Sequence, residues 1–224
     1  MNTLTTPPLA PLLDRLFDEA AAPWKLPPAV ADYWSGLSAE EQARLMRSKA
    51  DYREFYGHLK DVPLAVSPDT GRLLYMLARS LGARTILEFG TSFGISTLHL
   101  AAALKDNGGG RLITTEFEPT KVARARNNLV AGGLIDLVEI REGDALQTLS
   151  VDLPGTIDLL LLDGAKALYP EILSLVESHL RPGALIVADN ADFCPDYLVR
   201  VRSPAQGYLS VPFTSDVEVS MRIG

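Results

Sequence analysis

Three oxygen-bearing side chains in the C-terminal third of the chain could hold a metal ion. Asp163 directly follows one apolar run, and Asp189 and Asn190 directly follow another. If those runs are neighbouring strands of a parallel sheet, their carboxyl ends meet at one edge. Two carboxylates and a carboxamide, without histidine or cysteine, are typical ligands of a hard divalent cation such as Mg²⁺. Lys166 could reach an oxygen bound to that ion. Taken singly, each of these residues is more typical of a turn or an exposed surface, so the prediction depends on their combination.

A glycine loop and two further acids could bind an adenosine group. Gly90 and Gly94 lie between an apolar run and a helical segment, where glycine lets the backbone approach a ligand. The start of that helix, near Ser96, offers free N–H groups to a ligand carboxylate. Glu116 follows the next apolar run and could accept hydrogen bonds from a ribose diol, and Asp144 follows the third and could hold an exocyclic amine. The loop lacks the glycine patterns of dinucleotide folds and P-loops, which disfavours both.

From about residue 85 onwards, short apolar runs alternate with helical segments. This alternation predicts an α/β fold in which helices cover both faces of a parallel sheet. The last two apolar runs have no helix between them, which predicts an antiparallel pair at one sheet edge. The predicted strands are 85–87, 112–114, 137–140, 157–162, 184–188, 209–213 and 217–223, and the predicted helices between them are 95–104, 121–130 and 169–180.

The first 84 residues have helical periodicity interrupted by proline. Apolar residues recur at helical spacing from Leu9 to Ala20. Ser38 and Glu41 form a capping-box pattern, behind which an apolar stripe continues through Leu45, Tyr52, Tyr56 and Leu59. Ser67-Pro68 opens a further helix.

We therefore expect a helical extension over residues 1–60, followed by the main domain over residues 61–224. The extension has no strand of its own to cover, and it is expected to serve as a lid, a dimer contact or a pocket wall. Its aromatic side chains either pack on neighbouring helices or line a pocket for an aromatic ligand. They are Trp24, Trp34, Tyr52, Phe55 and Tyr56.

Composition excludes several classes of protein. The 224 residues have a net charge of −7, which disfavours binding to nucleic acid or to an anionic membrane. Cys194 is the only cysteine, so neither an intrachain disulfide nor a cysteine-cluster zinc site is expected. The apolar runs are too short to span a bilayer, and the N-terminus lacks the pattern of a signal peptide. We expect a cytoplasmic protein without a membrane or nucleic-acid partner.

The glycine loop also matches a hydrolase motif. Residues 90–94 fit the G-x-S-x-G nucleophile elbow, with Ser92 as the nucleophile, and Asp163 and His179 follow in the chain order of α/β-hydrolases. That fold needs several strands before the elbow, and none is predicted there. His179 also lies in the apolar phase of a predicted helix, where a structural histidine is more common. The hydrolase is therefore kept only as a minor alternative.

From about Val62 to the C-terminus, the chain resembles the cation-dependent, S-adenosylmethionine-dependent O-methyltransferases that include catechol and caffeoyl-CoA O-methyltransferases. The most specific feature is LLLDGAK with ADN, whose aspartates are 26 residues apart. The resemblance implies a Rossmann-like class I methyltransferase fold with a mostly parallel seven-stranded sheet and an antiparallel C-terminal edge pair. The stretches that carry it are VSPDTGRLL, ILEFGTSFGISTLHLA, TTEFEP, GDAL, LLLDGAKALY, RPGALIVADN and SVPF…VEVSMRI.

The resemblance also implies roles for individual residues. The methionine part of the cofactor would lie at Glu88, Gly90 and Ser96, the ribose at Glu116 and the adenine at Asp144 and Ala145, while Val66 belongs to the segment that closes over the cofactor. Mg²⁺ or a similar cation would be bound by Asp163, Asp189 and Asn190, and Lys166 would be the catalytic base. The residues implied to contact the cofactor are Val66, Glu88, Gly90, Ser96, Glu116, Asp144, Ala145 and Asp163.

The expected reaction is metal-assisted methyl transfer from S-adenosylmethionine to a small catechol-like acceptor, in a homodimer as the resemblance implies. Two features differ from the family pattern. Gly164-Ala165 stands where bulkier or acidic residues are common, and residues 1–60 lack a basic cluster for coenzyme A. A metal-independent methyltransferase and a non-catalytic binding protein remain as alternatives. The sequence identifies neither the acceptor, nor the methylated position, nor the ion.

Overall fold

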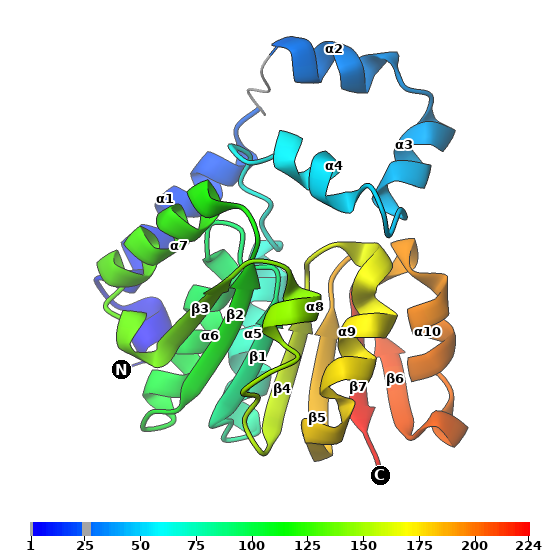
Figure 1. Cartoon of the computed structure of the whole chain (residues 1–224). Coiled ribbons are helices and arrows are strands. Elements are labelled where there is room, and N and C mark those ends of the chain that lie inside the picture. The colour runs from blue at the N-terminus through cyan, green and yellow to red at the C-terminus, as the bar shows by residue number, and fades with distance from the viewer. Residues whose placement is uncertain (1, 24–27) are drawn as a thin grey trace.

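The computed structural model describes residues 2–23 and 28–224, and its centre is a seven-stranded sheet (Figure 1). The strand order is β3-β2-β1-β4-β5-β7-β6; β1 to β5 run parallel, whereas β7 is antiparallel to both β5 and β6. The predicted α/β fold with an antiparallel edge pair is confirmed. The strands are β1 (Thr85–Phe89), β2 (Arg111–Glu116), β3 (Val138–Glu142), β4 (Ile157–Leu162), β5 (Leu180–Ala188), β6 (Tyr208–Pro212) and β7 (Glu218–Arg222).

Helices connect the parallel strands, as the alternating pattern predicts. Two of them begin at favourable residues: Ser67 accepts a hydrogen bond from the Thr70 N–H at the start of α5, and proline stands at the first position of α7. No helix in the described part of the chain is long and apolar enough to cross a membrane. The helices are α1 (Leu9–Ala21), α2 (Pro28–Gly36), α3 (Ala39–Met46), α4 (Tyr52–His58), α5 (Pro68–Ser80), α6 (Ile95–Asp106), α7 (Pro119–Ala131), α8 (Ala145–Thr148), α9 (Tyr169–Val176) and α10 (Pro195–Val201).

Two hydrophobic clusters, one on each face, hold the sheet between layers of helices. One cluster joins β1, β2 and β4 to α1, α5 and α6, and the other joins them to α9 and α10. Because helices cover both faces of the sheet, the strand sequences are continuous apolar runs. The segment from Ile157 to Leu162, for example, is almost wholly buried.

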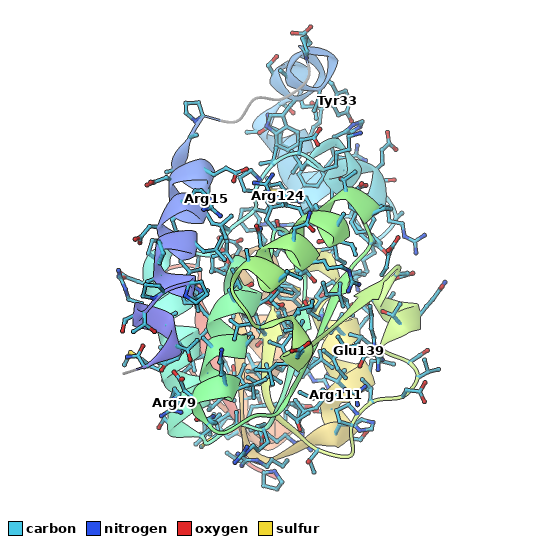
Figure 2. All side chains as sticks on the ribbon, turned by 90° about the vertical axis from the view of Figure 1, so that its left-hand side faces the viewer. Arg15, Tyr33, Arg79, Arg111, Arg124 and Glu139 are labelled. Carbon is cyan, nitrogen blue, oxygen red and sulfur yellow. The ribbon has the colours of Figure 1, made fainter. Side chains whose placement is uncertain are left out.

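The N-terminal extension divides into two parts. α1 packs into the first cluster through Leu9, Leu12 and Leu16, and Thr3 is anchored to Asp106 at the end of α6. By contrast, α2, α3 and α4 lie above the carboxyl ends of the parallel strands, at the top of Figure 1. We call residues 28–58 the lid helices. Figure 2 shows Tyr33 among them, at the end of the molecule far from Arg111 and Glu139.

One expectation within the extension is wrong, and one falls outside the described residues. The capping box is present, since Ser38 and Glu41 exchange hydrogen bonds at the start of α3. The apolar stripe behind it is not one helix, because α3 ends at Met46 and a turn closed by Ser48 and Asp51 precedes α4. Trp24 is the residue that lies outside the described ranges.

Candidate active site

Strand register gathers most of the predicted polar residues at one edge of the sheet. Phe89 pairs with Leu162, which in turn pairs with Ala188, so the loops after β1, β4 and β5 begin side by side. This edge is also where the chain order reverses, between β1 and β4, and open α/β sheets bind ligands at such a point.

Glycine is required where the loops after β1 and β4 touch. Gly90 has a φ of +100°, and a Cβ added there would lie 2.6 Å from the Gly164 nitrogen. A Cβ on Gly164 would lie 2.5 Å from the Phe89 ring. The departure from the family pattern at Gly164 therefore has a packing reason: only glycine fits against this aromatic ring.

Glu88 is enclosed beneath the glycine loop. Its side chain is fully buried and accepts hydrogen bonds from the hydroxyls of Ser96, Thr97 and Thr114 at 2.5–2.6 Å. Burial raises the pKa of Glu88 to about 7, although the three hydroxyl donors oppose the shift. The structure thus joins the predicted residues Glu88 and Ser96 directly, through a hydrogen bond between their buried side chains.

Glu116 organises the loop after β2. Its carboxylate accepts hydrogen bonds from three backbone N–H groups, those of Ser92, Phe117 and Glu118, at 2.9–3.0 Å. Burial raises the pKa of Glu116, while these donors and the nearby Lys121 oppose the shift. An ionised carboxylate has about four acceptor positions, so this side chain can still accept a ligand hydroxyl.

Asp144 links the loop after β3 to the lid helices. One carboxylate oxygen accepts from the Leu146 N–H and from the Tyr52 hydroxyl, and the other forms an ion pair with Arg53. Asp144 thus caps α8, as turn chemistry favours, and also contacts α4. Ala145 follows it and lies buried against the sheet.

These residues surround a narrow opening that we call the strand-end pocket. Its walls include Gly90, Ser92, Glu116, Phe117, Asp144 and Asp163. Tyr52 closes one side by meeting the Phe117 ring edge-on, with centroids 6.5 Å apart. Leu64 also lines it, whereas the predicted Val66 is buried in the hydrophobic core.

Asp163 and Lys166 form a buried ion pair at the end of β4. Lys166 Nζ lies 2.8 Å from Asp163 Oδ1 and 5.6 Å from the centre of the Tyr169 ring. Burial alone would lower the pKa of Lys166, but the charge of Asp163, with smaller contributions from Tyr169, Tyr56 and Asp189, raises it well above its usual value. Lys166 is therefore protonated in this arrangement.

Asp189 adds a second carboxylate at the same point. Burial, together with the negative charges of Asp163 and Asp216, raises the pKa of Asp189 to about 7, while Lys166 opposes the shift. Asn190 has a left-handed backbone (φ 49°), and its amide nitrogen lies 3.4 Å from the Asp216 carboxylate.

The donor set fits a hard divalent cation. In the described part of the chain, no three His, Cys, Asp or Glu residues cluster as metal ligands. The predicted set, however, has only two carboxylates, and its third ligand is the amide of Asn190. Asp163 is close enough to Asp189 for its charge to raise the pKa of Asp189, a crowding of negative charge that a cation would relieve.

A larger cavity lies between this acidic floor and the lid helices. Its volume is about 410 Å³, and its walls include Trp34, Phe55, Tyr56, Asp163, Lys166 and Asp189. We call it the lid cavity. Asp163, Tyr56 and Leu64 line both this cavity and the strand-end pocket, so the two spaces meet at the end of β4.

Many residues line the strand-end pocket without having been expected there; four of them are Tyr52, Leu64, Phe117 and Lys121. Of these four, only Phe117 had a usable signal, because it directly follows Glu116 at a strand end. The others reach the pocket from helices or from the segment before α5, and their positions depend on tertiary packing.

The hydrolase alternative is wrong. The Ser92 hydroxyl accepts a hydrogen bond from the Leu64 N–H. His179 contacts the Pro154 carbonyl at 2.7 Å, at the amino end of β4, whereas Asp163 lies at its carboxyl end. No catalytic triad can form across the length of that strand.

Comparison with known proteins finds similar methyltransferases. Residues 87–191 match a family model described as a methyltransferase domain. A catechol O-methyltransferase of Niastella koreensis is 42% identical over 130 residues, covering 57% of this chain and 58% of that protein. A catechol O-methyltransferase of Mycobacterium tuberculosis is 38% identical over 127 residues, covering 57% of each chain.

Among solved structures, the chain is similar to the O-methyltransferase TomG of Streptomyces achromogenes, which is involved in tomaymycin synthesis and was solved in complex with SAM. The two are 28% identical, with a TM-score of 0.62 over 88% of this chain and 96% of that one. The chain spans somewhat over half the length of the curated relatives it matches. The strand order, the loops at the strand ends and these relatives agree. The chain is similar to these O-methyltransferases, and its match to the methyltransferase-domain model covers residues 87–191.

Proposed function

We propose that the protein transfers a methyl group from S-adenosylmethionine to one hydroxyl of a vicinal-dihydroxy aromatic acceptor, with the help of a divalent cation. The observation that carries this proposal is the meeting of the two spaces at Asp163. A methyl donor in the strand-end pocket and an acceptor in the lid cavity would face each other there, beside Lys166 and Asp189.

In this proposal, the loops after the first three parallel strands hold the cofactor. Glu116 receives the ribose hydroxyls, and Asp144 and Ala145 lie at the adenine. Glu88 and Ser96 form a linked pair below Gly90, where the methionine part would lie. The walls of the strand-end pocket support the roles of Glu116, Asp144 and Ala145. Glu88 and Ser96 do not line it, and their role is supported by the family resemblance.

Asp163, Asp189 and Asn190 would hold the cation, preferably Mg²⁺, because all three present oxygen donors. When bound, the cofactor supplies a methyl group on a positively charged sulfur, and the cation supplies a charge that lowers the pKa of an acceptor hydroxyl. The charge of the bound cation would offset the negative charges of Asp163 and Asp189. This would remove the main reason why the pKa of Lys166 is high.

Lys166 is then placed to take the hydroxyl proton on Nζ. The acceptor oxygen forms a bond to the methyl carbon as the carbon–sulfur bond breaks, and the electron pair of that bond stays on sulfur. Tyr56 and Leu64 line both spaces. In this proposal the walls align oxygen, carbon and sulfur, and such alignment is a large part of this kind of catalysis.

The test is transfer of a labelled methyl group from S-adenosylmethionine to catechol, with Mg²⁺ and with EDTA. The proposal predicts O-methylated product with Mg²⁺ and loss of most turnover with EDTA. Full turnover in EDTA would support the metal-independent methyltransferase instead. Tight cofactor binding without any methylated acceptor would support the non-catalytic binding protein.

A further inference from the structure

The lid cavity is larger than a single catechol ring requires. An apolar cavity of about 150 Å³ is enough to bind benzene, whereas the lid cavity measures about 410 Å³. A one-ring acceptor held at Asp163 and Asp189 would therefore leave more than half of the space to water.

The chemistry of the wall changes along the cavity. The charged and amide groups gather on the floor, at the ends of β4 and β5, where the hydroxyls of the acceptor would lie. The lid helices supply mainly aromatic and aliphatic side chains. The apolar members of the wall include Val30, Trp34, Met46, Phe55, Leu59 and Phe193.

Three of the aromatic rings form a continuous row that leads away from the floor. Tyr56 is close enough to Lys166 for each to shift the other's titration. Phe55 meets Tyr56 edge-on, with centroids 4.9 Å apart, and Trp34 packs against Phe55 at 5.2 Å. A planar group extending from the floor would contact this row of rings, which favours aromatic over aliphatic extensions.

The wall offers little to an anionic extension. Among the lining residues that the structure describes, Lys166 is the only lysine or arginine, and its ammonium group is already bonded to Asp163. Burying a carboxylate or phosphate against Trp34 and Phe55 would cost free energy. His58, the one histidine among the described lining residues, lies 4.0 Å from the carboxylate of Glu54.

We propose that the preferred acceptor is an uncharged ortho-dihydroxy aromatic with a second ring, or an equally bulky apolar group, placed along Trp34, Phe55 and Tyr56. This inference rests on the proposed function, because it assumes that the dihydroxy end lies at Asp163 and Asp189. It adds the size and the charge of the rest of the acceptor.

The experiment compares three acceptors with the same dihydroxy head: catechol, 4-phenylcatechol and 4-(4-carboxyphenyl)catechol. We expect kcat/KM to be roughly 10- to 100-fold higher for 4-phenylcatechol than for catechol, in the range that one apolar group gives in an apolar pocket. The added carboxylate should cancel most of that gain. Equal kcat/KM for catechol and 4-phenylcatechol would overturn the proposal. Equal kcat/KM for 4-phenylcatechol and 4-(4-carboxyphenyl)catechol would also overturn it.

Two variants test the wall from opposite directions. Trp34→Ala removes the outer ring of the row, and Val30→Phe fills part of the space. Both should reduce the ratio of kcat/KM for 4-phenylcatechol to that for catechol at least fivefold. Leu209→Ala is the control, because it removes an exposed apolar side chain near the amino end of β6, whereas the cavity floor lies at the carboxyl ends of β4 and β5. If the two wall variants keep the parent preference, the row does not hold the second ring.

A binding measurement separates this inference from the proposed function. Calorimetry with S-adenosylhomocysteine, which cannot donate a methyl group, and Mg²⁺ gives the affinity of each acceptor without turnover. We expect 4-phenylcatechol to bind at least tenfold more tightly than catechol. If no acceptor is methylated, the proposed function fails, and this comparison of affinities still decides the inference.

Discussion

The strand-end pocket and the lid cavity are built in different ways. The first is formed almost wholly by loops whose positions follow from strand register and from close backbone contacts, such as that of Gly90 with Gly164. The second shares its floor with the sheet, but most of its walls belong to helices outside the sheet. A family can therefore keep one methyl donor and change acceptors by altering the lid alone.

Few polar contacts fasten the lid helices to the sheet. Arg53 and Tyr52 bind Asp144 at the strand-end pocket, and Lys49 pairs with Glu171 at an exposed position. The stronger attachment is thus on the cofactor side, since the side chain of Asp144 is 14% exposed and that of Glu171 is 38% exposed. The lid would be held in place by the same residue that is assigned to the adenine.

The largest effect is expected on the acidic floor. Asp189→Ala should lower Mg²⁺-stimulated turnover about 100-fold or more, because the charge stabilisation assigned to the cation is worth several kcal/mol. Affinity for S-adenosylhomocysteine should stay within about threefold, because the strand-end pocket does not include Asp189. Asp192→Ala, at an exposed position nearby, is the control. Parent-like Mg²⁺ stimulation in Asp189→Ala would refute the metal assignment.

Glu116 tests the cofactor side. Glu116→Ala should weaken cofactor binding by about 1.5–3 kcal/mol, roughly 10- to 100-fold, because hydrogen bonds to a charged group are lost. Part of this loss comes from the loop, since three backbone donors also lose their acceptor. Calorimetry measures it, with the exposed Glu142→Gln as the control. Unchanged affinity in a folded Glu116→Ala protein would remove this residue from the pocket.

Glu88 should make stability depend on pH. Its pKa is about 7 in the folded protein, against a usual 4.5. Between these pH values the folded state binds more protons than the unfolded chain, so the free energy of unfolding falls as pH rises. The fall is on the order of 3 kcal/mol.

The measurement is chemical unfolding between pH 5 and 8 in EDTA. Glu88→Gln should lose this part of the pH dependence, and the difference between parent and variant cancels the similar contribution of Asp189. Parallel curves for the two proteins would show that Glu88 is ionised at neutral pH despite its burial.

The smallest effect is expected at the lid contacts. Arg53→Ala should raise KM for S-adenosylmethionine two- to fivefold, because a partly exposed ion pair contributes up to about 1 kcal/mol. Lys49→Ala breaks the exposed pair, which lines neither space, and should change KM less than twofold. A larger effect from Lys49 than from Arg53 would contradict the asymmetric attachment of the lid.

Sequence patterns predict the strand-end pocket better than the lid cavity, and the reason is physical. Two-sided burial makes the strands readable as apolar runs, and β4 has the predicted bounds, residues 157–162. A parallel sheet then brings the residues after each strand to one edge, so the order of the apolar runs is enough to pair Asp163 with Asp189.

The lid could not be predicted in the same way. The separation of α1 from α2, α3 and α4 depends on packing. The leucines of α1 belong to the first cluster, whereas the described side chains of the lid helices contribute only Tyr52 and Tyr56, partly buried against the second. The contacts of Tyr52 and Arg53 with Asp144 span about 90 residues of chain. No local pattern encodes such a contact. The aromatic residues near Phe55 suggested a pocket wall, but nothing in the sequence distinguished Tyr52, on the strand-end pocket, from Trp34, on the lid cavity.

The most direct test of the central claim compares catechol with its 1,3-dihydroxy isomer, using a ¹³C-labelled methyl donor and NMR detection of the product. The two acceptors have the same size and charge, but only vicinal hydroxyls can bind one cation through both oxygens. With Mg²⁺ we predict an O-methyl signal from catechol that grows at least 100-fold faster than that from the isomer. Equal rates for the two isomers, unaffected by EDTA, would contradict a metal-assisted reaction at Asp163, Asp189 and Asn190.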